Sequence, residues 1–252
     1  MSSELSRERS ASERRSAART AVIWDVLNPI LGSGALDVLD IGGGTGGFAV
    51  RVAELGHRVR VVDPSPDALA ALTRRAQEAG VSDRVTGQQG DASSLLEVVD
   101  AASADLVLCH GVLEHVTDQA AALAAIGSVL RPGGRLSLLL NQRHAAVIGR
   151  AMAGHFQQAR ALLDPSGQQG EAPTGRGAGR RFTPDEATAL VTAAGFTVTA
   201  THGIRVFADL VPGSVLDLEP GAAQALVDLE QAVADLPAFL PLATQLHLLA
   251  QH

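Results

Sequence analysis

The sequence predicts an α/β fold in which a doubly wound sheet of parallel strands is covered by helices on both faces. An apolar run at 38–41 stops in glycines, and a helical pattern begins at once, which is typical of a buried strand, a tight turn and a helix. Strand-like and helix-like segments then alternate along the chain. With 252 residues and 46% hydrophobic content, the chain can bury one good-sized core, so we expect a single domain with insertions.

The element boundaries follow from local signals. Gly56 and Gly80 end the first two helices after the glycine turn, because glycine readily adopts the left-handed conformation that closes a helix. The segment 131–134, Arg-Pro-Gly-Gly, predicts a turn, and Thr183 followed by Pro184 indicates a helix start. Strands are expected at about 38–41, 58–62, 84–89, 105–109, 135–140, 196–201 and 242–249, and helices at about 17–30, 48–55, 64–79, 118–130, 142–163, 183–194 and 221–236.

Composition narrows the organisation and the partners. Residues 1–32 are expected to form a polar tail and a lid helix, and 33–252 a domain with insertions at about 142–182 and 208–241. The net charge of -7 gives no whole-surface attraction to nucleic acid or anionic membranes, so an RNA substrate would need a local basic patch. A single cysteine and the lack of a long apolar run favour a cytoplasmic protein without disulfides or a membrane span.

The glycine turn predicts a site for a nucleotide-like cofactor. Gly42, Gly44 and Gly47 satisfy the dinucleotide fingerprint, which is weak evidence by itself. Asp40 is more informative, because a carboxylate there would repel a pyrophosphate and suit a cationic ligand such as S-adenosylmethionine. Asp63 ends the second strand where a ribose diol would be held, a feature that NAD sites share.

Other positions could complete the cofactor site, each with a structural alternative. Asp91 would accept from an adenine amino group and Ala92 would offer its backbone N–H, although Asp91 could equally cap a helix. His110 could pack under the adenosine or be a core histidine. Arg19, at the start of the N-terminal helix, could reach the carboxylate of the cofactor or remain solvated.

The acceptor is expected at the carboxyl ends of the fourth and fifth strands. Asn141, Arg143 and His144 follow the fifth strand, and His115 follows the fourth, where it would line the pocket or simply begin a helix. A carboxylate acceptor needs no general base, and Arg143 or Arg205 would aim it. A hydroxyl acceptor would need a base, for which His115 and His144 are the candidates.

The end of the soft segment at 164–181 holds a basic cluster, the only one that we identify outside the N-terminal tail. It consists of Arg176, Arg180 and Arg181. These arginines could contact phosphates of a tRNA, or they could belong to a solvated linker.

Residues 36–141 resemble the class I S-adenosylmethionine-dependent methyltransferases, whose Rossmann-like sheet has seven strands with the last one antiparallel. The resemblance rests on four motifs: Asp40-Ile-Gly-Gly-Gly-Thr-Gly46, Asp63, Gly90-Asp91 and Arg131-Pro-Gly-Gly134.

A narrower resemblance, to the bacterial tRNA 5-carboxymethoxyuridine methyltransferases, spans nearly the whole chain. It rests on segments outside the common core, including 19–24, 108–115, 152–156, 203–207 and 226–230. It implies that the protein makes the methyl ester of a modified wobble uridine. The cofactor contacts that we expect, some implied by this resemblance and some by the glycine turn, come from Arg19, Asp40, Gly42, Gly43, Gly44, Asp63, Pro64, Asp91, Ala92 and His110.

Three alternatives remain open from the sequence. One is an O-methyltransferase of secondary metabolism that acts on a small molecule. Another is an NAD-dependent oxidoreductase, against which Asp40 argues. The third is a partner protein that binds S-adenosylmethionine without catalysis. No metal site is expected.

Overall fold

The computed structural model describes residues 20–164 and 179–252. These residues contain a seven-stranded sheet with the order β3-β2-β1-β4-β5-β7-β6. The strands are β1 (Asp37–Ile41), β2 (Arg58–Asp63), β3 (Val85–Gln89), β4 (Ala104–His110), β5 (Leu130–Asn141), β6 (Thr197–Ile204) and β7 (Gln245–Gln251). The predicted doubly wound sheet is therefore confirmed.

The first five strands run parallel, and β7 runs against β5. In β1, Asp40 pairs with Val61 of β2 and with Leu108 of β4 in a parallel register. At the beginning of β5, Gly133 N donates to His252 O at 3.1 Å, whereas at its end Gln142 N donates to Thr244 O at 3.0 Å. Since the start of β5 meets the end of β7 and its end meets the start of β7, the last strand is antiparallel, as predicted.

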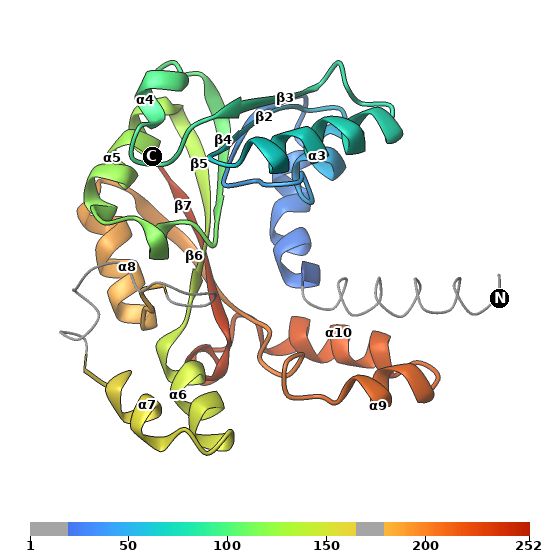
Figure 1. The fold of residues 1–252 in the computed structure, drawn as a ribbon, viewed down its shortest axis with the longest axis vertical. Helices are drawn as coiled ribbons and strands as arrows, with labels where there is room; N and C mark the ends of the chain where they lie inside the picture. Colours follow the sequence, from blue (N-terminus) through green and yellow to red (C-terminus); the bar gives the residue numbers. More distant parts are fainter. Residues whose placement is uncertain (1–19, 165–178) are drawn as a thin grey trace. The chain divides into compact units, whose positions relative to one another are not determined.

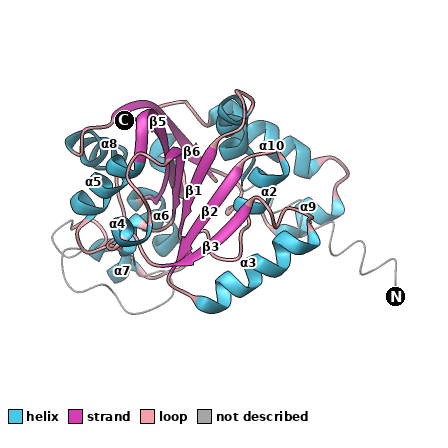
Figure 2. Cartoon of the chain, turned by 90° about the horizontal axis from the view of Figure 1, so that it is seen from above, coloured by secondary structure: helices cyan, strands magenta, loops and turns pink. Residues whose placement is uncertain are grey.

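Helices cover both faces of the parallel strands. In Figures 1 and 2, α2 (Ala49–Glu54) and α3 (Pro66–Glu78) lie on one face, and α4 (Leu95–Val98), α5 (Gln119–Val129) and α8 (Pro184–Ala193) lie on the other. The remaining helices are α6 (Arg143–Met152), α7 (Phe156–Ala161), α9 (Gly213–Leu218), α10 (Ala222–Val233), a helix at 20–31, and the 3-10 turns η1 (Leu113–His115) and η3 (Leu240–Leu242). None of the helices in the described ranges is long and apolar enough to cross a bilayer.

The chain forms two compact units. Of the described residues, 30–141, 179–200 and 248–252 form the sheet unit, and 20–29, 142–164 and 201–247 form the helical unit. Strands β1 to β5 build the core of the sheet unit, where the middle of β4 is fully buried. In the helical unit, Leu216 and Leu226 form one apolar cluster and Val206, Val233 and Ala243 form another. The predicted boundary at residue 32 and the predicted insertions stay predictions.

Several element predictions were wrong at their boundaries, and β6 extends to Ile204 instead of ending at 201. Three of the differences have a clear physical reason. Strand β5 begins at Leu130, because Arg-Pro-Gly-Gly forms a bulge within the strand, with a register shift opposite Ala104 and Leu106. The helix predicted at 142–163 is broken into α6 and α7 at Gly154, whose φ of 76° ends a helical run. Strand β7 begins at Gln245, because the preceding apolar residues form the turn η3, which contains proline.

Candidate active site

A cavity of about 630 Å³ opens at the carboxyl ends of β1, β2 and β4 in the sheet unit. This volume is within the range of about 300–1,000 Å³ that is usual for small-molecule sites. Six of the predicted site residues line it: Gly42, Asp63, Pro64, Asp91, Ala92 and His115. Asp40, Gly43, Gly44 and His110 are not among the residues that line this cavity. The cavity therefore lies at the edge of the sheet where the sequence predicts the cofactor.

The turn after β1 requires glycine both for its conformation and for space. Gly42, Gly44 and Gly46 have φ values of 69°, 55° and 80°, which side-chain-bearing residues rarely adopt. Gly42 N donates to Val62 O at 2.7 Å, which holds the turn beside the end of β2. A Cβ on Gly42 would lie 2.3 Å from Val112 Cγ2, so the loop after β4 packs directly onto the turn.

Asp63 is a fixed acceptor at the end of β2. Its Oδ2 accepts from Gly44 N and its Oδ1 from Ser65 N, each at 2.9 Å. The carboxylate is buried, yet the residue lines the cavity. A carboxylate has about four lone-pair sites, so those left over can accept from two hydroxyls of a ligand.

Asp40 lies beneath the glycine turn and is only 4% exposed. Burial, followed by the nearby charge of Asp63, raises the pKa of the Asp40 carboxyl to about 7. A Cβ on Gly43 would lie 2.5 Å from Asp40 Oδ2, so the carboxylate is in close contact with the turn. The ionised form would be stabilised by a positive charge beside the turn and opposed by a phosphate.

The raised pKa of Asp40 predicts a pH-dependent effect of Asp40→Asn on stability. Because the folded-state pKa is above the ordinary aspartate value of 3.8, the native state binds the proton more tightly than the unfolded chain. Above pH 3.8 the ionised carboxylate therefore costs native stability progressively, up to the folded pKa of about 7. At 1.36 kcal/mol per pKa unit, Asn should stabilise the protein by up to about 4 kcal/mol at about pH 8 and much less at about pH 5.

Urea unfolding at the two pH values measures this difference. The exposed Asp100→Asn is the matched control and should change the free energy of unfolding by less than about 0.5 kcal/mol, as surface substitutions usually do. An equal effect of Asp40→Asn at both pH values would contradict the buried, uncompensated carboxylate.

Asp91 caps the loop after β3. Its Oδ1 accepts from the backbone N and Oγ of Ser93, at 2.8 and 2.5 Å, and from the N and Oγ of Ser94, at 3.1 and 3.2 Å. The hydrogen bond from the Ser93 side chain is the largest of the contacts that lower the pKa of Asp91. Asp91 is not the N-cap of α4, which is Ser94 without a side-chain capping bond, so the alternative role as a helix cap was wrong and the carboxylate instead holds the turn that precedes the helix. Contact with an adenine, through Asp91 and the buried Ala92, stays a prediction.

His110 lies at the end of β4 as a neutral imidazole. A hydrogen bond of 2.8 Å joins its Nε2 to Ser137 Oγ, and the ring of Phe48 meets it edge-on at 5.0 Å between centroids. Burial lowers the pKa of His110 to about 4. The preceding residue, Cys109, is buried as predicted, and burial raises the pKa of its thiol to about 12, so it stays protonated at neutral pH.

The region where the acceptor is predicted contains a carboxylate that the sequence reasoning did not select. Glu114 is 4% exposed, and burial raises its pKa. Its Oε1 accepts from Asn141 Nδ2 at 2.6 Å, whereas its Oε2 has no hydrogen-bond partner within 20–164 and 179–252. This pair connects the loop after β4, which carries the exposed His115, to the end of β5. The sequence does contain a signal for this carboxylate, because Glu114 stands between the apolar residues Leu113 and Val116.

The segment 179–182 places Arg180, one of the arginines of the predicted basic cluster, beside Glu114. A Cβ on Gly179 would lie 2.9 Å from His115 Cε1, and Arg180 N donates to Glu114 O at 2.9 Å. The Arg180 side chain donates to Gln119 Oε1 at 2.9 Å and lies over the ring of Phe182. His115, Asn141 and Arg180 therefore meet around Glu114, beside the cavity.

Other predicted residues belong to the helical unit or lie outside the described ranges. Arg143, the first residue of α6, is buried, and the next residue, His144, is exposed. Arg205 adopts a φ of 62°, and its guanidinium donates to Asp209 and Gln245. Buried Glu230 holds the following loop by accepting from three successive backbone N–H groups at 206–208. Arg19 and Arg176 lie outside the described residues.

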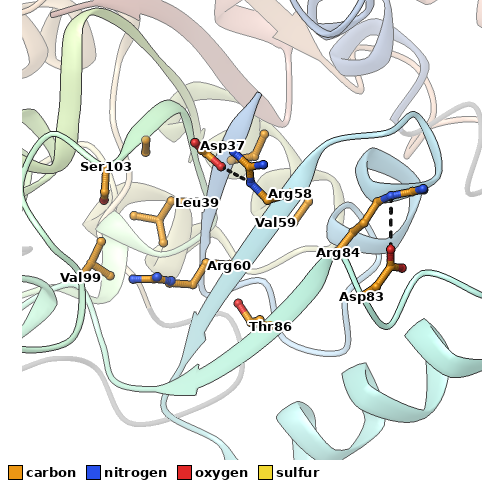
Figure 3. A pocket seen from close by; sticks show the side chains of 12 residues that line it. Asp37, Leu39, Arg58, Val59, Arg60, Asp83, Arg84, Thr86, Val99 and Ser103 are labelled. Atoms are coloured by element: carbon orange, nitrogen blue, oxygen red, sulfur yellow. Dashed lines mark hydrogen bonds and ion pairs between the residues drawn. The ribbon is translucent and has the colours of Figure 1, made fainter. Parts of the chain in front are cut away.

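A second cavity, of about 230 Å³, opens at the amino ends of the strands (Figure 3). Its wall holds two ion pairs, Arg58 with Asp37 at 2.7 Å and Arg84 with Asp83 at 3.8 Å. Figure 3 shows Arg60 turned away from both pairs. Because ligands of open α/β sheets bind beyond the carboxyl ends of the strands, the first cavity is the candidate active site.

Comparison with known proteins identifies the family of the chain. Residues 39–138 match a family described as "Methyltransferase domain". The tRNA 5-carboxymethoxyuridine methyltransferase of Escherichia coli (strain K12) is 30% identical over 239 residues, which cover 92% of this chain and 87% of that protein. A ubiquinone biosynthesis O-methyltransferase of Methylobacterium nodulans is 34% identical over 172 residues, covering 68% of this chain and 63% of that protein.

A solved structure has the same fold. The 1,6-didemethyltoxoflavin-N1-methyltransferase of Burkholderia thailandensis, with bound S-adenosylhomocysteine, superposes with a TM-score of 0.55. It is 23% identical, covering 93% of this chain and 77% of that chain. The protein is an enzyme that uses S-adenosylmethionine, and not an NAD-dependent oxidoreductase. The chain belongs to the S-adenosylmethionine-dependent methyltransferases, in the family of the tRNA 5-carboxymethoxyuridine methyltransferases.

Proposed function

We propose that the protein methylates the carboxylate of 5-carboxymethoxyuridine in tRNA, which forms a methyl ester. The observation that carries this proposal is the extent of the likeness to the Escherichia coli enzyme, which covers 92% of the chain. The domain that matches the general methyltransferase family ends at residue 138. The likeness therefore extends beyond the general methyltransferase domain into the helical unit. Two enzymes with different acceptors would be expected to differ there, so the likeness supports a shared acceptor.

The described residues fit S-adenosylmethionine, which when bound supplies an activated methyl group on a positively charged sulfur. Asp63 is held by Gly44 N and Ser65 N and would accept from the ribose hydroxyls. Asp40 lies below the turn, where the positive charge of the sulfur would favour its ionised form, and there is no room for a side chain at Gly43. Asp91 and Ala92 line the same cavity and would hold the adenine.

Methyl transfer to a carboxylate needs alignment more than proton transfer. The acceptor is ionised at neutral pH, so no base has to activate it. The enzyme has to hold the carboxylate oxygen in line with the methyl group and the sulfur. Arg180 lies beside His115 and Asn141, next to the cavity, and its positive charge would orient the acceptor. Arg181 follows it in the chain. Arg143 and Arg205 stay candidates for the same task, and Arg176 for a phosphate contact.

The test is transfer of labelled methyl from S-adenosylmethionine to tRNA that carries 5-carboxymethoxyuridine. We expect label in the tRNA and in one modified uridine after nuclease digestion. Mild alkali should release that label as methanol, because it hydrolyses a methyl ester but leaves methyl groups on nitrogen, carbon or ether oxygen in place. Label that resists alkali would contradict the ester.

Two histidine variants provide the control for the mechanism. His115→Ala and His144→Ala together should leave the turnover number within about fivefold, because a carboxylate acceptor needs no general base. A fall of about 100-fold or more, the lower limit typical of general-base catalysis, would contradict transfer to a carboxylate.

Methylation of a small-molecule hydroxyl is the second candidate. It is favoured by the ubiquinone O-methyltransferase relative and by the net charge of -7, which disfavours RNA over most of the surface. Label transfer to a metabolite extract and not to tRNA would select it. A tRNA substrate would agree with the cytoplasmic location predicted from the sequence.

A further inference from the structure

We propose that the α6–α7 hairpin, residues 143–163, is a docking surface for single-stranded RNA of the substrate. This inference rests on the proposed tRNA substrate and names the part of the protein that would contact it. Figure 1 shows α6 and α7 side by side, and Arg150 of α6 donates to Gln158 Oε1 of α7, so the two helices are held together.

The charge of this region is opposite to that of the whole chain. Residues 119–163 contain five arginines and no aspartate or glutamate, although the chain has a net charge of -7. Three of these arginines, Arg143, Arg150 and Arg160, belong to the hairpin; Arg143 is buried, Arg150 is half-buried, and Arg160 is exposed, so the last two carry the positive charge of its surface. A local positive surface on an acidic protein can attract the phosphate backbone where the rest of the surface repels it.

The hairpin also exposes large apolar side chains. Met152 is 74% exposed, Phe156 is 70% exposed, and Ile148 and Leu163 are exposed as well. Ile148 and Met152 are four residues apart and thus share one face of α6. Phe156 is the one aromatic residue among the exposed large hydrophobics of the described chain. Such a group of apolar side chains indicates an interaction surface.

The combination of Phe156 and Arg160 fits unpaired nucleotides. The two residues are four apart in α7, so the ring and the guanidinium project from the same side of the helix. Single-stranded RNA is bound by stacking of its bases on aromatic rings while cations contact the backbone. A second copy of this chain is a poorer occupant, because a two-fold interface would place the arginines of one hairpin against those of the other.

Binding of an anticodon stem-loop RNA to the full-length protein, with S-adenosylhomocysteine present, tests the surface. Phe156→Ala should raise the RNA Kd by about 5- to 150-fold without changing its salt dependence, because it removes a stacking platform. Arg160→Gln should reduce the slope of log Kd against log salt concentration by about 0.7, the value for one phosphate contact on a single strand. Leu55→Ala and Arg74→Gln, at exposed positions on and beside other helices, are matched controls and should change neither quantity.

The outcomes separate this inference from the proposed function. Unchanged RNA affinity in both hairpin variants, in a wild-type protein that still methylates tRNA, overturns the docking surface alone. Failure of the wild type to methylate tRNA overturns the proposed function. If sedimentation shows a dimer that Phe156→Ala dissociates while RNA binding stays intact, the occupant is a second copy and the inference is wrong. Retained affinity for S-adenosylhomocysteine and for free 5-carboxymethoxyuridine nucleoside excludes misfolding of the variants.

Discussion

Replacing Asp63 with alanine is expected to raise the Kd for S-adenosylhomocysteine by about 100-fold or more. A hydrogen bond to a charged group contributes about 1.5–3 kcal/mol, and the free lone pairs of this carboxylate would accept from both ribose hydroxyls. The variant also leaves Gly44 N and Ser65 N without the acceptor that each has at 2.9 Å, so the glycine turn loses support. Isothermal titration calorimetry measures the change directly.

The control for Asp63 is Asp100→Ala, which removes an exposed acid outside the cavity. It should leave the affinity within about twofold, because surface substitutions away from a site usually change free energies by less than 0.5 kcal/mol. If the Kd of Asp63→Ala for S-adenosylhomocysteine is within about fivefold of the wild-type value, the lost free energy is smaller than that of one hydrogen bond to a charged group. The assignment of Asp63 to the ribose would then be wrong.

Gly43→Ala is expected to destabilise the protein by about 1–3 kcal/mol, the usual cost of overpacking, and to abolish measurable cofactor binding. The new Cβ would lie 2.5 Å from Asp40 Oδ2, 2.6 Å from Asp40 Cγ and 3.0 Å from Val61 Cγ1. Asp40 is buried in β1 and cannot move aside easily, so the turn would have to shift away from its position above the strand. Thermal unfolding and calorimetry with S-adenosylhomocysteine give the two readouts.

Gly47→Ala is the matched control, because a Cβ there meets only Arg75 Nη1 at 3.9 Å. Its stability should stay within about 0.5 kcal/mol of the wild type. In an Asp40→Ala background, Gly43→Ala should destabilise the protein less, because the Asp40 carboxylate atoms that clash with the new Cβ are absent. A double-mutant cycle measures this coupling. Equal behaviour of the two glycine variants would show that the close contact with Asp40 does not limit the turn.

Most of the sheet could be predicted from the sequence because its signals are local. The glycines at 42–47 require a turn between an apolar strand and a helix, and β1, β2 and β4 lie within a residue or two of the predicted ranges. The predicted start of α8 is confirmed as a full capping box between Thr183 and Glu186. Predictions were wrong where one signal had two structural meanings, as at 131–134, where proline and glycine form a bulge within β5.

The candidate site was predictable only in part for the same reason. Asp63 and Asp91 follow strands, so their places at the cavity follow from strand order. The contact of Glu114 with Asn141 joins residues 27 positions apart, and that of Arg180 with Gln119 joins residues 61 apart. No local pattern encodes such pairs. Arg150 and Arg160 of the hairpin were overlooked because the arginines there are scattered along the sequence and do not form a run.

The sequence by itself determined the order of strands and helices, the glycine turn and the two carboxylates, Asp40 and Asp63, at the ends of β1 and β2. These features depend on local backbone preferences and on alternation of apolar and polar residues. Only the tertiary structure decided that Glu114, Asn141, His115 and Arg180 meet beside the cavity, and that Phe156 and Arg160 are presented to solvent on a separate hairpin. Both outcomes depend on which distant segments exclude water from one another, and that is a property of the packed chain.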